Sequence, residues 1–163
     1  MITRSGFSIP LIAIQIAKSV SKIIQLGMPT FTHHSAKAVI SPKDVNGLQE
    51  VFFTGLIDAR SFACLQSRVM RHLSGTRAVV LRYDHAALML SESQPIDASA
   101  YENAPVLAAV VKAAFLPMAS QYAAKLGRLG VIAAVFSDSS AQIALAHQWA
   151  ARHMLASRSK SPV

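Results

Sequence analysis

The sequence predicts an α/β fold, with a mixed sheet of about five strands that starts with an antiparallel hairpin and continues with parallel strands joined by crossover helices. One observation is a change of period: a run rich in β-branched and aromatic residues over 49–54 gives way to helical spacing after Asp58. The other is that further apolar runs over 77–83, 105–111 and 131–138 alternate with helical segments. Strand, helix and strand in this order form right-handed βαβ units. About four helices are therefore expected to pack on the sheet.

The composition is typical of one globular domain in a reducing compartment. The chain has 163 residues, of which 52% are hydrophobic and 15% charged, and no run reaches the about 18 apolar residues of a membrane span. Its single cysteine, Cys64, cannot form an internal disulfide and falls beside the buried stripe of a predicted helix. We therefore expect an inert core thiol and a cytoplasmic protein.

The net charge of +8 is concentrated near the two ends of the chain. All eight acidic residues lie between Asp44 and Asp138, whereas five of the 16 basic residues lie in the terminal segments. The central body keeps 11 basic residues against 8 acidic ones, a charge of about +3. Basic tails can touch phosphate backbones or anionic lipid, but basic residues at the ends of a chain are more often simply solvated, so no nucleic-acid partner is expected.

Residues 1–27 form an amphipathic segment that is expected to be a helix outside the core. Isoleucines share one side of this helix, and Gly27 can end it. Polar side chains recur on the other side, at Gln15, Lys18, Lys22 and Gln25. Three interpretations stay open: a helix that touches a membrane or the domain's own surface, a degenerate export or transit segment, and translated sequence upstream of a start at Met28. The expected organisation is an appendage over 1–27, a domain over 28–157 and a polar tail over 158–163.

The leading hairpin is predicted from a turn between two apolar runs. The segment 41–47 contains proline, aspartate and an Asn-Gly pair, which favour turn dihedrals, so a strand over 34–40 is expected to pair with the strand over 49–54. His33 and His34 are adjacent on a strand, so their side chains point to opposite faces. No third ligand stands at a matching spacing, and a metal site is not expected.

The first crossover helix is predicted to begin at Asp58, whose carboxylate can accept the free amide hydrogens of the first turn. Its apolar residues recur at helical spacing, at Phe62, Leu65, Val69 and Leu73. Ser74 and Gly75 are expected to end the helix and to lead into the strand over 77–83.

Asp84 and His85 follow this strand at its carboxyl end and precede a short apolar segment, 86–90, which is predicted to be helical. Asp84 is then a natural N-cap, although an Asp beside a His can also form an acid-base pair. The next segment, 91–103, is polar, contains a proline and is predicted to be a surface loop.

The last third of the chain continues the alternation. A buried parallel strand over 105–111 is followed by a helix over 116–128, with a proline in its first turn and glycines near its end. The strand over 131–138 ends in Asp138, which is predicted to cap a final helix over 139–156.

No motif in the sequence names a reaction. We find no glycine-rich phosphate loop, nucleophile elbow, zinc pattern or helical His-Glu pair, so no catalytic residue, metal or cofactor is expected. Sites in α/β sheets form where strands end and helices begin. The candidate binding or interaction residues at these places are Asp58, Asp84, His85, Asp138 and Ser139. Capping explains them as well, and both a ligand pocket and a protein interface stay open.

Three phrases of the sequence resemble the STAS superfamily, the fold of anti-sigma-factor antagonists and of the cytoplasmic domains of sulfate transporters. They are FTGLIDARSF, RAVVLRYDHAALML and LPMASQYAAKLGRLGVIAAVFSDSSAQIALAHQWA. The resemblance covers roughly residues 31–156, and the chain looks most like the small stand-alone bacterial STAS/SEC14-like proteins. The resemblance implies a regulatory, protein-protein interaction module, and its SEC14-like side implies that a small apolar ligand can be bound.

The sequence departs from the family at one informative place. In the phosphorylated antagonists a serine follows the aspartate at the strand end, and phosphate there opposes partner binding through its charge. Here Asp84 matches the aspartate, but His85 and Ala86 follow it. A phosphoserine switch of this kind is therefore not expected.

The first hypothesis for function is a non-enzymatic interaction module that works through the segment at Asp84 and the neighbouring strand ends, with a protein partner or a second copy of the chain. The alternative is a carrier of a small hydrophobic ligand, a lipid or a nucleotide, in a cavity left by alanine-rich helices. An enzyme that uses Asp84 and His85 ranks third.

Overall fold

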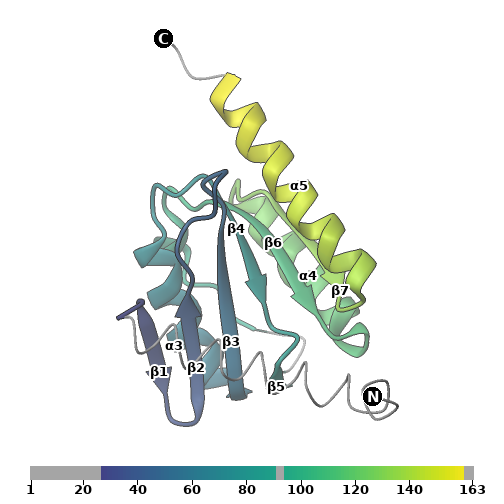
Figure 1. Cartoon of the computed structure of the whole chain (residues 1–163). Coiled ribbons are helices and arrows are strands. Elements are labelled where there is room, and N and C mark those ends of the chain that lie inside the picture. The colour runs from purple at the N-terminus through teal and green to yellow at the C-terminus, as the bar shows by residue number, and fades with distance from the viewer. Residues whose placement is uncertain (1–26, 91–93, 160–163) are drawn as a thin grey trace, which may run out of the picture.

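The computed structural model describes residues 27–90 and 94–159, which form one mixed sheet with helices on both faces (Figure 1). The elements follow in the order β1 (Thr30–His33), β2 (Ala36–Ile40), β3 (Gln49–Asp58), α3 (Ala59–His72), β4 (Ala78–Arg82), β5 (Ala86–Met89), the 3-10 helix η1 (Ala98–Tyr101), β6 (Val106–Val111), the 3-10 helix η2 (Ala113–Phe115), α4 (Leu116–Arg128), β7 (Ala133–Ser137) and α5 (Ser140–Ser159).

The sheet confirms the predicted α/β class and its mixed topology. The strand order is β1-β2-β3-β4-β6-β7, and β5 pairs with β3 away from this path. The pairs β1–β2 and β2–β3 are antiparallel, and the others are parallel. The described residues hold seven strands and three α-helices, against the predicted five strands and four helices. The predicted N-terminal helix lies outside the described residues.

One missed strand is β1, which precedes the predicted hairpin. Residues Thr30–His33 pair with Ala36–Ile40, so the chain turns at His34, which adopts a φ of 55°. His34 was expected inside a strand and instead lies in this turn. A four-residue strand has too short a pattern for its period to be read, and a positive φ is tolerated by histidine more readily than by branched residues.

Strand β3 continues through Gly55, where the sequence predicted its end. Gly55 has a φ of +84°, and a Cβ placed there would lie 2.1 Å from the backbone oxygen of Ser35. A glycine is therefore required both by the dihedral and by the close approach of the β1–β2 turn. Before Gly55 the strand pairs with β2 and β4, and from Gly55 to Asp58 it pairs with β5.

The predicted helix over 86–90 is wrong, because this segment forms β5. Ala86 and Leu88 face the interior while Ala87 and Met89 face outward, which is the two-residue period of a strand. A five-residue apolar run fits a strand or a helix equally well, and here pairing with the free second half of β3 decides the outcome. Asp84 consequently caps no helix.

The remaining predicted elements are confirmed, with ends that shift by one to three residues. Helix α4 occupies the predicted range, and Leu129, which follows it, is exposed. The segment 91–103 is more structured than predicted for a surface loop. Its described part contains η1, and Gln94, Ala100 and Tyr101 are buried.

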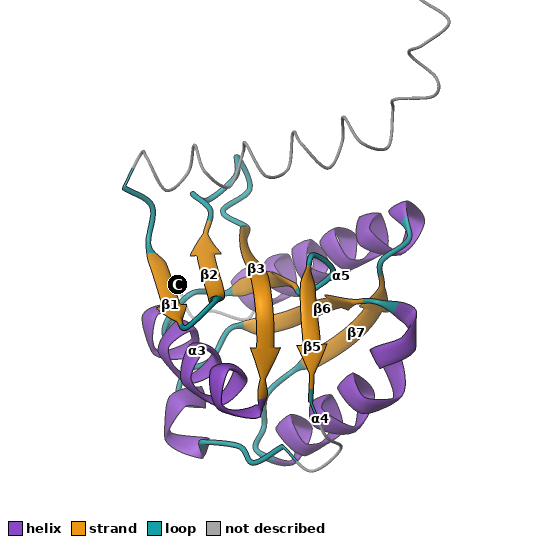
Figure 2. Ribbon diagram, turned by 90° about the horizontal axis from the view of Figure 1, so that it is seen from below, coloured by secondary structure: helices purple, strands orange, loops and turns teal. Residues whose placement is uncertain are grey.

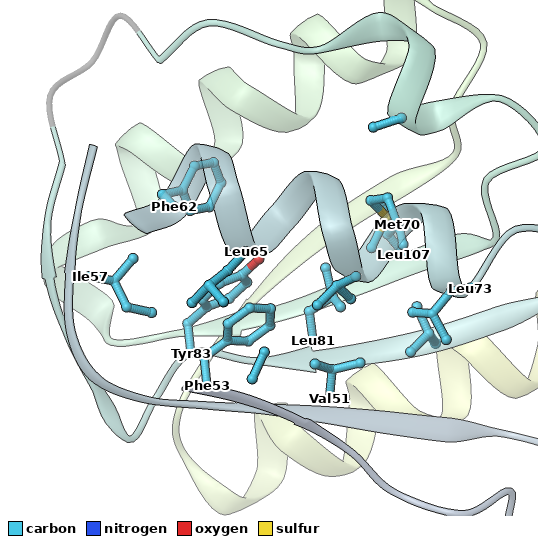
Figure 3. Packing of buried hydrophobic residues seen from close by; sticks show 14 of the residues in the cluster. Val51, Phe53, Ile57, Phe62, Leu65, Met70, Leu73, Leu81, Tyr83 and Leu107 are labelled. Carbon is cyan, nitrogen blue, oxygen red and sulfur yellow. The ribbon is translucent and has the colours of Figure 1, made fainter. Parts of the chain in front are cut away.

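The two faces of the sheet carry cores of different size. Helices α3 and α4 cover one face and enclose the larger core, whereas α5 lies across β4, β6 and β7 on the other face (Figures 1 and 2). In the larger core, Phe53 and Tyr83 stack with ring centroids 4.2 Å apart beneath α3 (Figure 3). The smaller core consists of Leu48, Ala78, Val80, Ala108, Val110, Ala146, Ala150 and Met154.

Candidate functional site

Asp58 caps α3, as the sequence predicted. Its Oδ1 accepts a hydrogen bond from the Ser61 amide at 2.8 Å. This backbone hydrogen bond, together with the Ser61 side chain, lowers the pKa of Asp58. The Ser61 hydroxyl also lies 3.0 Å from Nδ1 of His33, so the start of α3 is tied to β1. Capping explains Asp58 fully.

Asp84 lies in the turn between β4 and β5 and is held by Arg82. The guanidinium donates from Nε and Nη2 to the two carboxylate oxygens at 2.9 and 2.8 Å, a bidentate pair that occupies both oxygens. Burial alone would raise the pKa of Asp84, but the hydrogen bonds and charge of Arg82, with a smaller contribution from His85, outweigh burial and lower it. Asp84 is therefore a buried anion with a partner.

The guanidinium of Arg82 also connects Asp84 to α5, through Glu50 and His147. Nη1 of Arg82 donates to Oε2 of Glu50 at 3.1 Å, and Oε1 of Glu50 lies 3.1 Å from Nε2 of His147. On the other side, Nε2 of His85 lies 3.3 Å from Oδ2 of Asp84. The row His85, Asp84, Arg82, Glu50 and His147 thus joins β3, β4 and α5 by a continuous series of polar contacts.

This row connects α5 to the sheet, and the contacts of Asp84 do not favour proton transfer to it from His85. Arg82 hydrogen-bonds to both oxygens of Asp84 and lowers its pKa, so Asp84 is a weak proton acceptor for His85. The predicted pair Asp84 and His85 is in contact.

Asp138 and Ser139 precede α5, and the cap is Ser139 rather than the predicted Asp138. The Ser139 hydroxyl accepts from the Gln142 amide at 3.2 Å, and its carbonyl accepts from the Ile143 amide at 2.9 Å. The prediction was off by one residue because aspartate and serine are both good caps. Among the described residues, no hydrogen bond or ion pair joins Asp58, the Asp84–His85 turn and the Asp138–Ser139 turn.

The strongest candidate site is a cavity of about 70 Å³ between α4 and the sheet, flanked by α3 and β5. Alanines face it from three elements and leave the space that larger side chains would fill: Ala109, Ala119, Ala123 and Ala133. Several lining side chains are only half-buried, so the cavity reaches the surface among Leu88, Leu90, Phe115, Met118 and Tyr122. None of its described lining residues is charged.

A row of hydrogen-bonded neutral groups runs along the wall of this cavity. The Tyr83 hydroxyl donates to Oε1 of Gln66, and Nε2 of Gln66 donates to the Tyr101 hydroxyl at 3.1 Å. The hydroxyls of Tyr101 and Tyr122 are 3.0 Å apart. Burial is the main cause that raises the pKa of all three phenols, so they stay protonated.

The hydrogen atoms of this row point in one direction. The bond between Tyr101 and Tyr122 can have either oxygen as donor, but the Tyr122 oxygen is the one acceptor in the row that is left for the hydrogen of the buried Tyr101, so we assign Tyr101 as the donor. If the Gln66 amide were turned around, the hydrogen of the wholly buried Tyr83 would lose its acceptor, which costs about 1–3 kcal/mol. Tyr122, whose side chain lines the cavity, therefore ends the row with a hydroxyl hydrogen that no member of the row accepts.

Gln94 supplies a hydrogen-bond acceptor to the same cavity. Its side chain lines the cavity and is 5% exposed, and its Oε1 has no hydrogen-bond partner among the residues that the structure describes. Buried amide oxygens are almost always paired, because an unpaired one loses its bond to water without replacement. The cavity thus combines apolar walls with one vacant acceptor and one free donor.

Sequence reasoning missed Gln66, Gln94, Tyr101 and Tyr122 as site residues. Tyr122 was predicted only to face the core, and Gln94 and Tyr101 were placed on a surface loop. The alanine content of the helices was the one available signal, and it led to the carrier hypothesis. A second and wider hollow, of about 450 Å³, lies beside η1 and the start of β7, but no unpaired buried polar atom lines it.

The described part of the chain contains no cluster of three or more His, Cys, Asp or Glu residues placed to hold a metal ion. Within the same ranges, no helix has the length and apolar character needed to cross a membrane. Comparison with known protein families, with curated proteins and with solved structures finds no match to this chain. The resemblance to the STAS superfamily therefore stays a prediction.

Proposed function

We propose that this domain binds a small, largely apolar molecule in the cavity beneath α4, without catalysing a reaction. The observation that carries the proposal is the vacant Oε1 of Gln94 in a cavity with otherwise apolar walls. Binding pockets typically combine apolar walls with a few polar groups that fix orientation. A site built in this way favours the carrier hypothesis over the interaction module.

The chemistry of the walls supports binding rather than catalysis. The phenols of Tyr83, Tyr101 and Tyr122 have raised pKa values, so none of them is a base near neutral pH. The charged row that includes Asp84 and Glu50 lies with α5 and the smaller core, and none of its residues lines the cavity.

Toluene is a suitable first probe, because it is a single apolar ring and the cavity opens to the surface. A ligand that binds only the folded state stabilises that state by RT ln(1 + L/Kd), where L is the free ligand concentration, and so raises the unfolding temperature of the protein as the ligand concentration rises. We expect toluene to raise the unfolding temperature of the purified protein, and native mass spectrometry to detect any apolar molecule retained from the cell.

A space-filling variant tests where the probe binds. Ala123→Leu places a larger side chain on the cavity wall and should abolish the toluene effect. The matched control is Ala124→Leu, at an exposed position on the same helix, which should keep it. If toluene stabilises Ala123→Leu as well as it stabilises the unmodified chain, the cavity is not its site.

A second candidate function is the interaction module of STAS type, without a phosphoserine switch. It is favoured by an exposed apolar patch on the outward face of the β3–β5 pair, beside the turn that holds Asp84 and His85. Leu56 and Met89 are 45% and 65% exposed there. Exposed apolar side chains that cluster on adjacent strands are typical of protein contacts.

This second proposal predicts a partner that Met89→Glu releases. The control is Ile132→Glu, which introduces the same charge at an exposed position at the start of β7. A partner retained by both variants, or lost from both, would contradict a role for the β3–β5 patch.

A further inference from the structure

We infer that the ligand of the cavity beneath α4 is an uncharged, single-ring-sized molecule that both donates a hydrogen bond to Oε1 of Gln94 and accepts one from the Tyr122 hydroxyl. This inference rests on the proposed function and specifies the chemistry that the site recognises.

The need for a donor follows from Gln94. Its Oε1 has no partner among protein atoms, and its side chain is nineteen-twentieths buried, so bulk water does not reach it freely. A site with a buried acceptor discriminates strongly against a ligand that lacks the matching donor, because the acceptor is then left unpaired. A hydroxyl or an N–H group on the ligand supplies this donor.

The need for an acceptor follows from the direction of the tyrosine row. Tyr83 donates to Gln66, Gln66 donates to Tyr101, and Tyr101 donates to Tyr122. The Tyr122 hydrogen has no acceptor within the row, and its side chain lines the cavity. Each phenol is held neutral by a raised pKa, so the row offers a hydrogen without offering a charge.

We infer an uncharged ligand because the described residues that line the cavity are themselves uncharged. No described lining residue carries a charge that could neutralise a carboxylate, a phosphate or an ammonium group. Burying an unpaired ion in such a cavity is strongly unfavourable. Nucleotides and anionic lipid headgroups are therefore poor ligands for this site, whereas phenols, small alcohols and heteroaromatic N–H compounds fit it.

The size of the ligand follows from the volume. One water-sized sphere occupies about 10–15 Å³ on this scale, so about 70 Å³ admits a few waters or one small ring. The half-buried side chains at the rim leave room for a short substituent that extends to the surface.

Four probes separate these properties at nearly constant size: toluene, anisole, phenol and benzoate. Toluene has neither donor nor acceptor, anisole has an acceptor only, phenol has both, and benzoate is charged. Dissociation constants measured by calorimetry near neutral pH should place phenol at least about tenfold tighter than toluene, although toluene is the more apolar molecule. Benzoate should bind weakest.

Two variants assign the preference to its residues. Gln94→Leu should reverse the order, so that toluene binds tighter than phenol, whereas Met118→Leu, an apolar exchange at the rim, should keep the order. Anisole, which can accept a hydrogen bond from Tyr122, should bind the unmodified protein tighter than toluene does. Tyr122→Phe removes this donor and should make the two dissociation constants similar. Since each variant is compared across probes, a change in overall stability does not imitate the result.

The outcomes distinguish the two proposals. If toluene binds and phenol binds no tighter, the inferred polar recognition is overturned while the proposed function stands. The same holds if benzoate binds tightest, or if Gln94→Leu leaves the order unchanged. If no probe binds the unmodified protein, the proposed function itself is overturned, and the inference falls with it.

Discussion

At Gly55 the geometry leaves no room for a side chain. The residue combines a φ of +84° with the close approach of the Ser35 carbonyl, and it lies where β3 changes its neighbours. The positive φ costs L residues energy, and the collision adds to this cost.

The prediction at this scale is that Gly55→Ala lowers the free energy of unfolding by about 2–3 kcal/mol or more. Gly75→Ala is the matched control, because Gly75 has a φ of +86° but no atom within 4 Å of the place that an added methyl group would take. We expect that variant to cost only about 1 kcal/mol. Urea unfolding measures both, and equal losses would show that contact with Ser35 contributes nothing.

The predictability of single residues depends on how local their partners are. Asp58 could be identified as a cap because its partner, Ser61, is three residues away. Gln66 and Tyr101 are 35 residues apart, and nothing in either local pattern indicates that they meet. Asp84 was misassigned because its partner, Arg82, belonged to a segment that was read only as an apolar strand.

Among the elements, α5 is attached to the sheet by a titratable contact. Nδ1 of His147 lies 2.8 Å from the Ile143 carbonyl, and Nε2 lies 3.1 Å from Glu50. Both ring nitrogens thus face acceptors, which favours the imidazolium. The hydrogen bond to Glu50 raises the pKa of His147, although burial opposes the shift. Burial alone would raise the pKa of Glu50, but His147 and Arg82 outweigh it and lower it.

These directions predict a window of pH in which the contact stabilises the fold. The His147 contribution is complete below its unfolded pKa of 6.5 and is lost as the pH rises through the folded value. The Glu50 contribution is present above its unfolded pKa of 4.5 and is lost as the pH falls through the folded value. The contact should therefore contribute most between these two pH values.

The measurement is urea unfolding from about pH 5 to about pH 9. Relative to His147→Gln, the unmodified chain should lose stability as the pH rises from 6.5 through the folded pKa of His147. Identical slopes for the two proteins would show that the Glu50 contact carries no proton linkage.

The smaller core makes a second prediction for α5. Ala150 is fully buried against the sheet, so Ala150→Leu overpacks the contact and should cost about 1–3 kcal/mol. Ala144→Leu, at an exposed position of the same helix, should stay within about 0.5 kcal/mol of the unmodified chain. Thermal unfolding of the two variants compares them directly, and equal stabilities would contradict close packing of α5.

Elements were predictable where the period was long and the flanking signals agreed. The range of α4 was recovered because 13 residues show the helical repeat and a proline marks the first turn. The five-residue segment 86–90 was misread because its structure is decided by the free edge of β3, which no local pattern reveals. The same applies to the four residues of β1, whose pairing depends on the turn at His34.

For the molecule as a whole, one sheet serves both cores and should couple them. Residues of β4 alternate between the two cores: Val79 and Leu81 face the larger one, and Ala78 and Val80 face the smaller one. A substitution that weakens the packing of one core therefore destabilises strands that also form the other core. The sequence could predict this layered architecture, because alternation of strands and helices depends on many residues at once.

We predict that the described domain unfolds in a single step. Trp149 is the one tryptophan and packs against Phe136 beside the smaller core, so its fluorescence reports on that side. Leu65→Ala, in the larger core, should cost about 2–5 kcal/mol and shift the Trp149 transition by the same amount as the far-ultraviolet dichroism transition. Two separate transitions would mean that the faces unfold independently.

The row from Tyr83 to Tyr122 makes selectivity depend partly on Tyr101, which does not line the cavity but hydrogen-bonds to the Tyr122 hydroxyl that does. A reversed row would leave the hydrogen of the buried Tyr83 without an acceptor, so the Tyr122 hydroxyl keeps a hydrogen to donate. A single substitution at Gln66, which links Tyr83 to Tyr101 by hydrogen bonds, would therefore change which ligands bind, even if every residue at the rim of the cavity stayed the same.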